Sequence, residues 1–280
     1  MAVLAQIIAW LNVVANALGK LLLAPIAVLP GWLSSTIVAA TLGLVMLIVF
    51  KYTSQQQAIR HVRDDIKAHL LALKLFPDSL SVTFRAQGRI LRGAFALLLL
   101  AVVPMLVMIV PVSLLLGQLS LWYQARPLRV GEEAVITMQL AGVAEAPWPD
   151  VALEPAPAAD VVTGPVRILS QREICWNLKA CENGYHRLLF RVNGEPVEKE
   201  LAVGDGFMST SAERPGWCWS DILLQPAEPP FGPDCTARAI RIDYPSRTSW
   251  TSGTDWWLAY CFAASMFFAW CFRPLLKVNL

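Results

Sequence analysis

Three strongly apolar stretches of the chain carry no charged residue. These uncharged runs cover residues 33–50, 93–125 and 256–272. A helix needs about 20 apolar residues to cross the roughly 30 Å hydrocarbon core of a bilayer, and about 17 is the lower limit. The pattern therefore predicts three transmembrane helices, and only 16% of all residues are charged, against about a quarter in soluble domains. We expect an integral membrane protein.

The polar positions of residues 2–23 gather on one side of a predicted helix. Gln6, Asn12, Asn16 and Lys20 fall within about 120° of one another on a helical wheel, and the other positions are mostly apolar. Such a helix is expected to lie in the membrane interface rather than to span it. A signal peptide is the competing interpretation, although the segment lacks a positive N-terminal region and a well-placed cleavage site.

Apolar residues recur at three- and four-residue steps on both sides of "LFPDSL". Ile59, Val62 and Ile66 form the stripe of a first helix, and Phe84 and Leu91 belong to that of a second. So short a turn predicts an antiparallel hairpin over 51–92. The second helix continues into the next apolar run, which predicts one rod of about 45 residues and about 65 Å.

Residues 126–250 have a different pattern, with short alternating runs between proline- and glycine-rich turns. The runs "EICWNLKA", "YHRLLFRV" and "VEKELAV" predict a three-stranded meander. Ile174 and Trp176 would share one face with Leu178 and Ala180, and Leu188, Phe190 and Val192 would match them. "EEAVITMQL" and "ARAIRIDYP" are further strands. Roughly seven short strands favour an all-β immunoglobulin-like sandwich.

The formal net charge of +2 hides an asymmetry along the chain. Residues 51–92 hold eight Lys and Arg against three acidic residues, whereas residues 126–255 hold twelve against eighteen. Positively charged loops beside membrane spans face the cytoplasm. We therefore expect a cytoplasmic hairpin and C-terminus, an N-terminus and β domain outside, and a place in the cell inner (cytoplasmic) membrane. Anionic lipid headgroups explain the basic loop better than nucleic acid does.

Aromatic residues are placed to form belts at the two membrane surfaces. The expected outer belt consists of Trp32, Trp122, Tyr123, Trp250, Trp256 and Trp257, and the expected inner belt of Tyr52 and Trp270. The expected organisation is an α-helical membrane protein with an inserted β domain. Its segments are the interfacial helix (1–30), first span (31–50), hairpin (51–92), second span (93–125), β-sandwich (126–250), third span (255–273) and cytoplasmic tail (274–280).

The sequence offers little for catalysis. It has no phosphate-binding glycine loop, no GxSxG and no HExxH motif, and no acidic residue inside a predicted span. The presence of only three histidines and the lack of a CxxC pair argue against a zinc site. We expect no enzyme activity, cofactor or metal. Four cysteines, Cys175, Cys181, Cys218 and Cys235, lie in the outward segment and leave three disulfide pairings or free thiols open.

Two prolines interrupt the second span. Pro104 and Pro111 each deprive the carbonyl four residues earlier of its hydrogen-bond donor, and seven residues bring both defects to one side of the helix. Freed carbonyls are tolerated in membranes where protein or water satisfies them. Met105 and Met108 flank this side, and Met46 lies in the first span. Methionine suits surfaces that accommodate varied apolar partners, although prolines and methionines also occur in spans without such a role.

The order of these features resembles a known superfamily. A first span ending "VMLIVFKYTSQQ", a basic hairpin and a second span reading "VVPMLVMIVPVSLLLGQL" are similar to the YidC/Oxa/Alb superfamily of membrane-protein insertases, in particular its short three-span branch. That branch includes the archaeal YidC-like proteins and the third subunit of the ER membrane protein complex. The β domain is an addition. The resemblance implies a groove open to the cytoplasm and to lipid, with Lys51, Arg89 and Arg92 supplying charge and Met46, Met105 and Met108 an apolar slide.

Two hypotheses follow. The first is an insertase-like or chaperone-like protein that helps hydrophobic segments of nascent membrane proteins enter the bilayer, without ATP or covalent chemistry. The alternative is a structural subunit, in which the spans anchor the β-sandwich and the sandwich docks a protein partner in a larger membrane complex. A channel or transporter is less favoured, because three spans without buried charge offer little pathway.

Overall fold

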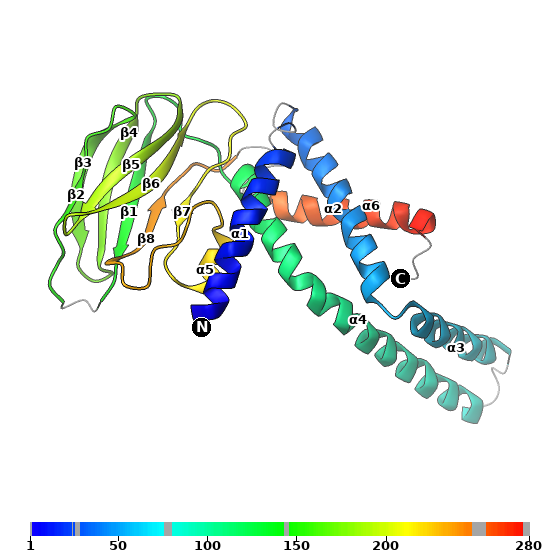
Figure 1. Ribbon diagram of the computed structural model, residues 1–280. Coiled ribbons are helices and arrows are strands. Elements are labelled where there is room, and N and C mark those ends of the chain that lie inside the picture. Colours follow the sequence, from blue (N-terminus) through cyan, green and yellow to red (C-terminus); the bar gives the residue numbers. More distant parts are fainter. Residues whose placement is uncertain are drawn as a thin grey trace. The chain divides into compact units, whose positions relative to one another are not determined.

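The structure of the protein is a computed structural model that describes residues 2–23, 25, 29–75, 80–142, 146–247 and 256–276 (Figure 1). The chain divides into two units. Unit 1 comprises residues 1–35 and 113–260, and unit 2 comprises residues 36–112 and 261–280. The described helices are α1 (Ala2–Leu23), α2 (Gly31–Thr53), α3 (Gln56–Leu75), α4 (Leu80–Tyr123), α5 (Trp219–Leu224) and α6 (Trp256–Leu276).

Among the described residues, four helices are long and apolar enough to cross a membrane. They are α1, α2, α4 and α6. The sequence pattern predicted three spans, so the count of three is not confirmed, because residues 5–23 of α1 also meet the requirements of length and hydropathy. Several long apolar helices indicate a membrane-associated protein.

The predicted continuous rod is confirmed. Helix α4 runs for 44 residues and contains both Pro104 and Pro111 in its interior. At 1.5 Å per residue this is about 65 Å, roughly twice the thickness of the hydrocarbon core. Three basic residues of the predicted hairpin, Arg85, Arg89 and Arg92, therefore lie on the same helix as the apolar second span.

In unit 2, α3 lies beside the N-terminal half of α4 (Figure 1). A Cβ atom on Gly93 would come within 2.7 Å of Cγ1 of Ile66, so the glycine permits a close approach. Ile59 of α3 and Ala86 of α4 are buried. The predicted stripe of α3 is correct here, but that of α4 is wrong, because Phe84 and Leu91 are 70% and 74% exposed. Small residues bring the helices close together, and the bulky residues are left outside.

A second close contact in unit 2 joins α2 and α6. A Cβ atom on Gly43 would lie 2.3 Å from the carbonyl oxygen of Ser265 and 3.2 Å from the nitrogen of Ala269. No side chain fits at this position. The two helices therefore touch backbone to backbone at Gly43, as membrane helices do at small residues.

The β domain of unit 1 contains two antiparallel sheets in its described part. The five-stranded sheet has the order β3-β4-β1-β8-β7, and the three-stranded sheet has the order β2-β5-β6. The strands are β1 (Glu133–Leu140), β2 (Val151–Leu153), β3 (Ala159–Ile168), β4 (Glu173–Ala180), β5 (Gly184–Val192), β6 (Glu195–Val203), β7 (Glu213–Arg214) and β8 (Ala237–Ile242). Buried residues of both sheets form one apolar core.

The predicted inward faces are confirmed, but the predicted meander is wrong. Strand β4 pairs with β1 and β3, whereas β5 pairs with β2 and β6 in the other sheet. Trp176 and Phe190 consequently meet across the core, with ring centroids 5.2 Å apart in an edge-to-face arrangement. The alternation of apolar and polar residues determines which side chains point inward, but it does not determine which strand is the hydrogen-bonded partner. Only β5 and β6 form the expected hairpin, in which Asn193 and Gly194 have positive φ angles of 51° and 88°.

Helix α1 packs against the protein through Ala5, Ile8 and its two asparagines, whereas Gln6 and Lys20 of the predicted polar side are exposed. Ala5 and Ile8 contact Ile222 of α5, and Asn12 donates from Nδ2 to the carbonyl oxygen of Ile222 at 2.5 Å. Asn16 donates in the same way to Pro226 at 2.6 Å. The exposed surface of α1 is mostly apolar and includes Val3, Ile7, Trp10, Val13, Val14, Leu18, Leu21 and Leu22. An apolar outer side is what a lipid environment requires.

The expected outer aromatic belt is only partly present. Trp32 and Trp256 are exposed, but Trp122, Tyr123 and Trp257 are buried. The rings of Trp122 and Tyr123 pack on that of Phe207, at centroid distances of 5.7 and 5.2 Å. Their role is therefore to fix the end of α4 inside unit 1 rather than to face lipid. Trp250 lies outside the described residues.

Candidate functional site

Six of the eight predicted groove residues lie on α4, within unit 2. Arg89, Arg92 and Pro111 are exposed, as is Met105 with 64% of its surface accessible. Met108 is half-buried and Pro104 is buried. The two methionines are three residues apart and thus neighbours on the helix surface. The six positions therefore lie along one helix, and the side chain of Met105 is exposed.

The membrane-length part of α4 is exposed on most of its circumference. Besides Met105, the exposed apolar residues are Leu98, Leu99, Val102, Val103, Leu106, Val107, Ile109 and Val110, each between 40% and 63% accessible. An apolar surface of this extent requires lipid or another protein. Helix α4 thus offers a long, accessible apolar surface.

The two prolines have different surroundings. They lie seven residues apart and on the same side of α4, but Pro104 is buried whereas Pro111 is exposed. The break at Pro111 frees the carbonyl oxygen of Val107, a residue that is 52% exposed. A carbonyl oxygen freed within an apolar surface is suited to a hydrogen-bond donor from protein or water, because lipid tails offer none.

The remaining two predicted residues, Met46 and Lys51, lie on α2 and are half-buried. Lys51 is in the last turn of α2, where a cation interacts favourably with the helix dipole. Both belong to unit 2, as do the six residues on α4. The groove that the resemblance implies between the spans stays a prediction.

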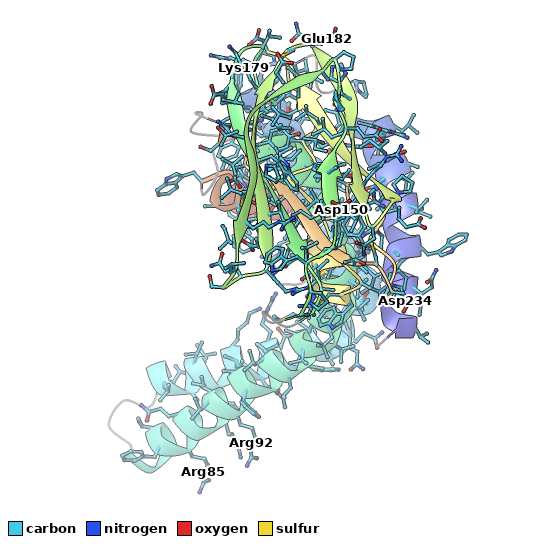
Figure 2. The ribbon with its side chains drawn as sticks, turned by 90° about the vertical axis from the view of Figure 1, so that its left-hand side faces the viewer. Arg85, Arg92, Asp150, Lys179, Glu182 and Asp234 are labelled. Carbon is cyan, nitrogen blue, oxygen red and sulfur yellow. The ribbon has the colours of Figure 1, made fainter. Side chains whose placement is uncertain are left out.

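The N-terminal part of α4 carries a basic side. Figure 2 shows Arg85 and Arg92 extending from the same side of the helix, two turns apart. Both are exposed, whereas Gly93 of the same helix faces Ile66 of α3. On α3, the pair between Lys67 and Asp64 is 3.4 Å long and exposed, so it contributes little to stability.

Sequence reasoning did not identify the polar contacts that Arg247 makes at the C-terminal end of α4 in unit 1. Arg247 donates from Nε to the carbonyl oxygen of Trp122 at 3.0 Å and from Nη2 to that of Met208 at 3.2 Å. Its guanidinium lies 4.6 Å from the ring centroid of Phe207, and burial lowers its pKa to about 10. These partners are 125 and 39 residues away, so no local pattern indicates them.

The segment after α4 is held by a second arginine. Arg126 forms two hydrogen bonds of 2.8 Å with the two carboxylate oxygens of Glu132, and the backbone nitrogen of Arg129 adds a third at 2.9 Å. The hydrogen bond from Arg126 lowers the pKa of Glu132 to about 2. A bidentate pair of this kind fixes orientation as well as distance.

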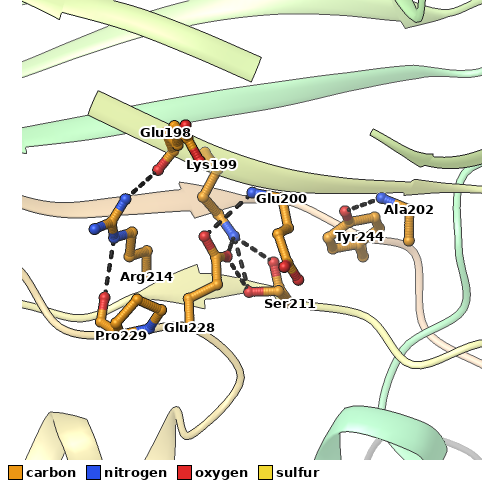
Figure 3. A network of polar contacts seen from close by, with 9 residues as sticks. All are labelled: Glu198, Lys199, Glu200, Ala202, Ser211, Arg214, Glu228, Pro229 and Tyr244. Atoms are coloured by element: carbon orange, nitrogen blue, oxygen red, sulfur yellow. Dashed lines mark hydrogen bonds and ion pairs between the residues drawn. The ribbon is translucent and has the colours of Figure 1, made fainter. Parts of the chain in front are cut away.

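A buried polar network lies within the β domain (Figure 3). The ammonium of Lys199 donates to the carboxylate of Glu228 and, at 3.0 Å, to the hydroxyl of Ser211. Lys199 and Glu228 have side-chain exposures of 0% and 4%. Burial lowers the pKa of Lys199, and the neighbouring carboxylate opposes this effect. The other oxygen of Glu228 accepts from the backbone nitrogen of Glu200 at 3.1 Å.

The comparisons with known proteins give no relative. No family model matches the chain, and no curated protein and no solved structure is similar to it. The resemblance to the insertase superfamily therefore stays a prediction from the residues quoted above.

Proposed function

We propose that the chain is an insertase-like or chaperone-like membrane protein, in which the surface of α4 receives hydrophobic segments of other membrane proteins. The observation that carries this proposal is the exposure of α4. Its apolar residues from Leu98 to Val110 are accessible on most sides, including the polarisable side chain of Met105. A span that packs so little against its own protein retains a surface for other helices.

The proposed topology places residues 51–92 in the cytoplasm and the β domain outside, in the inner membrane. The excess of Lys and Arg in 51–92 supports the orientation. The contacts of α1 support an interfacial helix and three spans. Ala5 contacts α5 and Asn16 bonds Pro226, so α1 lies along one domain over most of its length. A helix that crossed the bilayer would contact a domain outside the membrane only through its last one or two turns.

The β domain is proposed to be a sandwich of the immunoglobulin-like type. Two antiparallel sheets with one shared core support this proposal. In the proposed topology, its place between α4 and α6 in the chain would make it the extracytoplasmic part of the protein. It would hold the outer ends of the spans while clients contact their membrane-length parts.

The mechanism needs neither ATP nor a covalent step. Met105 offers a flexible apolar contact, and the carbonyl freed by Pro111 offers a hydrogen-bond acceptor to a polar group that enters the bilayer. Arg89, Arg92 and Lys51 place positive charge toward the cytoplasmic end. Together they lower the barrier for a segment that is apolar in its centre and polar at its end.

The test is site-specific photocrosslinking during synthesis of a model membrane protein. A photoreactive residue at Met105 is expected to crosslink to the nascent segment, whereas one at Leu119, which is buried on the same helix, is not. Reversing the charges of Lys51, Arg89 and Arg92 together should slow insertion of that segment. Equal crosslinking from both positions, or none from Met105, would contradict the proposal.

A structural subunit remains the second proposal, and one observation favours it. Strand β3 is an edge of the five-stranded sheet, and its Val161, Val162 and Val166 are 47–51% exposed. An exposed apolar edge strand is a site for another chain. The structural subunit would be favoured over the insertase by two results together. A partner protein would copurify in a one-to-one ratio and be lost when these valines are replaced by Lys, and a photoreactive residue at Met105 would give no crosslink to nascent segments.

A further inference from the structure

A cavity of about 450 Å³ lies in unit 1 where the C-terminal ends of α1 and α4 meet the β domain. Lys20 comes from α1, Gln118 and Trp122 from α4, Tyr185 from β5 and Glu200 from β6. The segment from Ser209 to Ser211 lines a further side. The cavity thus combines charged, hydroxyl and aromatic groups from four distant parts of the chain, and its volume is that of a small-molecule site.

The walls of the cavity are fixed by hydrogen bonds. Gln118 donates from Nε2 to Oδ1 of Asn16 on α1. Gly19 permits this contact, because a Cβ atom there would come within 2.6 Å of Oε1 of Gln118. The backbone nitrogen of Thr210 bonds the carbonyl oxygen of Leu121 at 2.8 Å. The cavity is therefore held open by bonded groups on two helices and a loop.

The buried network of Figure 3 supports the wall that carries Glu200. Glu228 accepts from the backbone nitrogen of Glu200, while Lys199 and Ser211 bond the same carboxylate group. This arrangement holds the backbone of Glu200 and leaves its side chain for another partner. Within the described part of the chain, the side chains of Lys20 and Glu200 form no hydrogen bond or ion pair.

We propose that this cavity binds the head group of a phospholipid with a primary ammonium, that is, a phosphoethanolamine group. Two unpaired charges of opposite sign line one cavity, which fits a ligand that carries both a cation and an anion. Glu200 is placed for the ammonium, and the aromatic rings of Trp122 and Tyr185 favour a cation beside it. Lys20 and the hydroxyls of Ser209 and Thr210 are placed for the phosphodiester.

The surroundings favour a lipid over a soluble molecule with the same chemistry. The cavity lies at the end of the apolar part of α4, where the proposed topology puts the outer headgroup region. Leu115 of α4 and Leu18 of α1 are 39% and 52% exposed and offer apolar surface for acyl chains. The inference rests on that topology and does not depend on the transfer of client segments.

The experiment is native mass spectrometry of the detergent-purified full chain, titrated with single lipids. The probes are a phosphatidylethanolamine, a phosphatidylcholine with the same acyl chains, and soluble glycerophosphoethanolamine. Variants Glu200→Gln and Lys20→Gln are compared with Glu198→Gln, an exposed acid two residues away that pairs with Arg187, and with the exposed Lys179→Gln. Each control removes the same charge outside the cavity.

The expected result is a preference of at least tenfold for the phosphatidylethanolamine over the phosphatidylcholine in the wild type and in both controls. Glu200→Gln should abolish this preference, and Lys20→Gln should weaken both lipids. Equal binding of the two lipids by the wild type, or equal loss in the control variants, would overturn the proposal. If soluble glycerophosphoethanolamine bound as tightly as the phosphatidylethanolamine, the claim that the ligand is a membrane lipid would be overturned. Client crosslinking at Met105 is a separate readout, so failure of one proposal is distinguishable from failure of the other.

Discussion

Arg247 donates a hydrogen bond from Nε to the carbonyl oxygen of Trp122, across 3.0 Å and 125 residues of sequence. The acceptor is in the last turn of α4, where helix carbonyls lack donors of their own. The same guanidinium bonds Met208 and lies over Phe207. One side chain therefore connects the end of a long apolar helix, a loop of the β domain and the segment that precedes α6.

Replacement of Arg247 by Ala is expected to destabilise unit 1 by roughly 2–4 kcal/mol, because two carbonyl oxygens lose a charged donor. Arg247→Lys should recover only part of this, since an ammonium cannot reproduce the planar fork. The measurement is denaturant unfolding of the full chain in detergent, followed by near-UV circular dichroism. Arg238→Ala, at an exposed position on β8, is the control, and an equal loss there would contradict the assigned role.

The pair between Arg126 and Glu132 predicts a pH dependence. The folded-state pKa of Glu132 is lowered from 4.5 to about 2, so its contribution is fully present above about pH 4.5 and is lost as the pH falls toward 2. Glu132→Gln should cost about 1–2 kcal/mol at neutral pH, a figure reduced for partial exposure of the pair. The difference between wild type and variant should shrink in acid. The exposed Glu195→Gln is the control, and a pH-independent difference would contradict the prediction.

The buried pair of Lys199 and Glu228 predicts a non-additive double mutant. Lys199→Met leaves the Glu228 carboxylate buried without its cation, and we expect a loss of about 3–5 kcal/mol. Adding Glu228→Gln removes the unpaired charge and keeps an oxygen for the backbone nitrogen of Glu200. The double variant should therefore be more stable than Lys199→Met alone, by thermal unfolding of the full chain. Additive losses would show that the two groups act independently.

The backbone contact at Gly43 predicts a steric requirement in unit 2. Gly43→Leu should separate α2 from α6 and cost about 1–3 kcal/mol in an SDS titration followed by helical circular dichroism. Gly88 on α4 is the matched control, since a Cβ atom there meets nothing within 4 Å. Gly88→Ala should be neutral or stabilise by up to about 1 kcal/mol. Tolerance of Leu at position 43 would contradict close packing of the two helices.

The hairpin of α3 and α4 shows which features the spacing of apolar residues can predict and which it cannot. The three- and four-residue steps correctly predicted both helices, their continuation into the second span and the inner side of α3 at Ile59 and Ile66. They assigned the wrong side of α4, because hydrophobicity alone ranks Phe84 and Leu91 above Ala86 and Gly93. Contact between helices depends on how closely the backbones approach, and the small residues decide that.

In the candidate sites, too, some features follow from the sequence and others only from the tertiary structure. The position of Met105, Pro104 and Pro111 on one long helix follows from sequence spacing, whereas their exposure does not, since Pro104 is buried and Pro111 is accessible. The cavity of Lys20 and Glu200 and the network of Lys199 and Glu228 join residues far apart in the chain. No local pattern carries information about such pairs.

The sequence by itself determined the apolar helices, the basic hairpin, the single rod of α4 and the inward faces of the strands. These features follow from local composition and from periods of 3.6 and 2, which each segment carries in its own residues. The tertiary structure alone decided that β4 and β5 lie in different sheets, that α1 turns its asparagines toward the protein, and that Arg247 holds Trp122. Those outcomes depend on which segments meet in space, and packing and hydrogen bonding between distant residues settle that question.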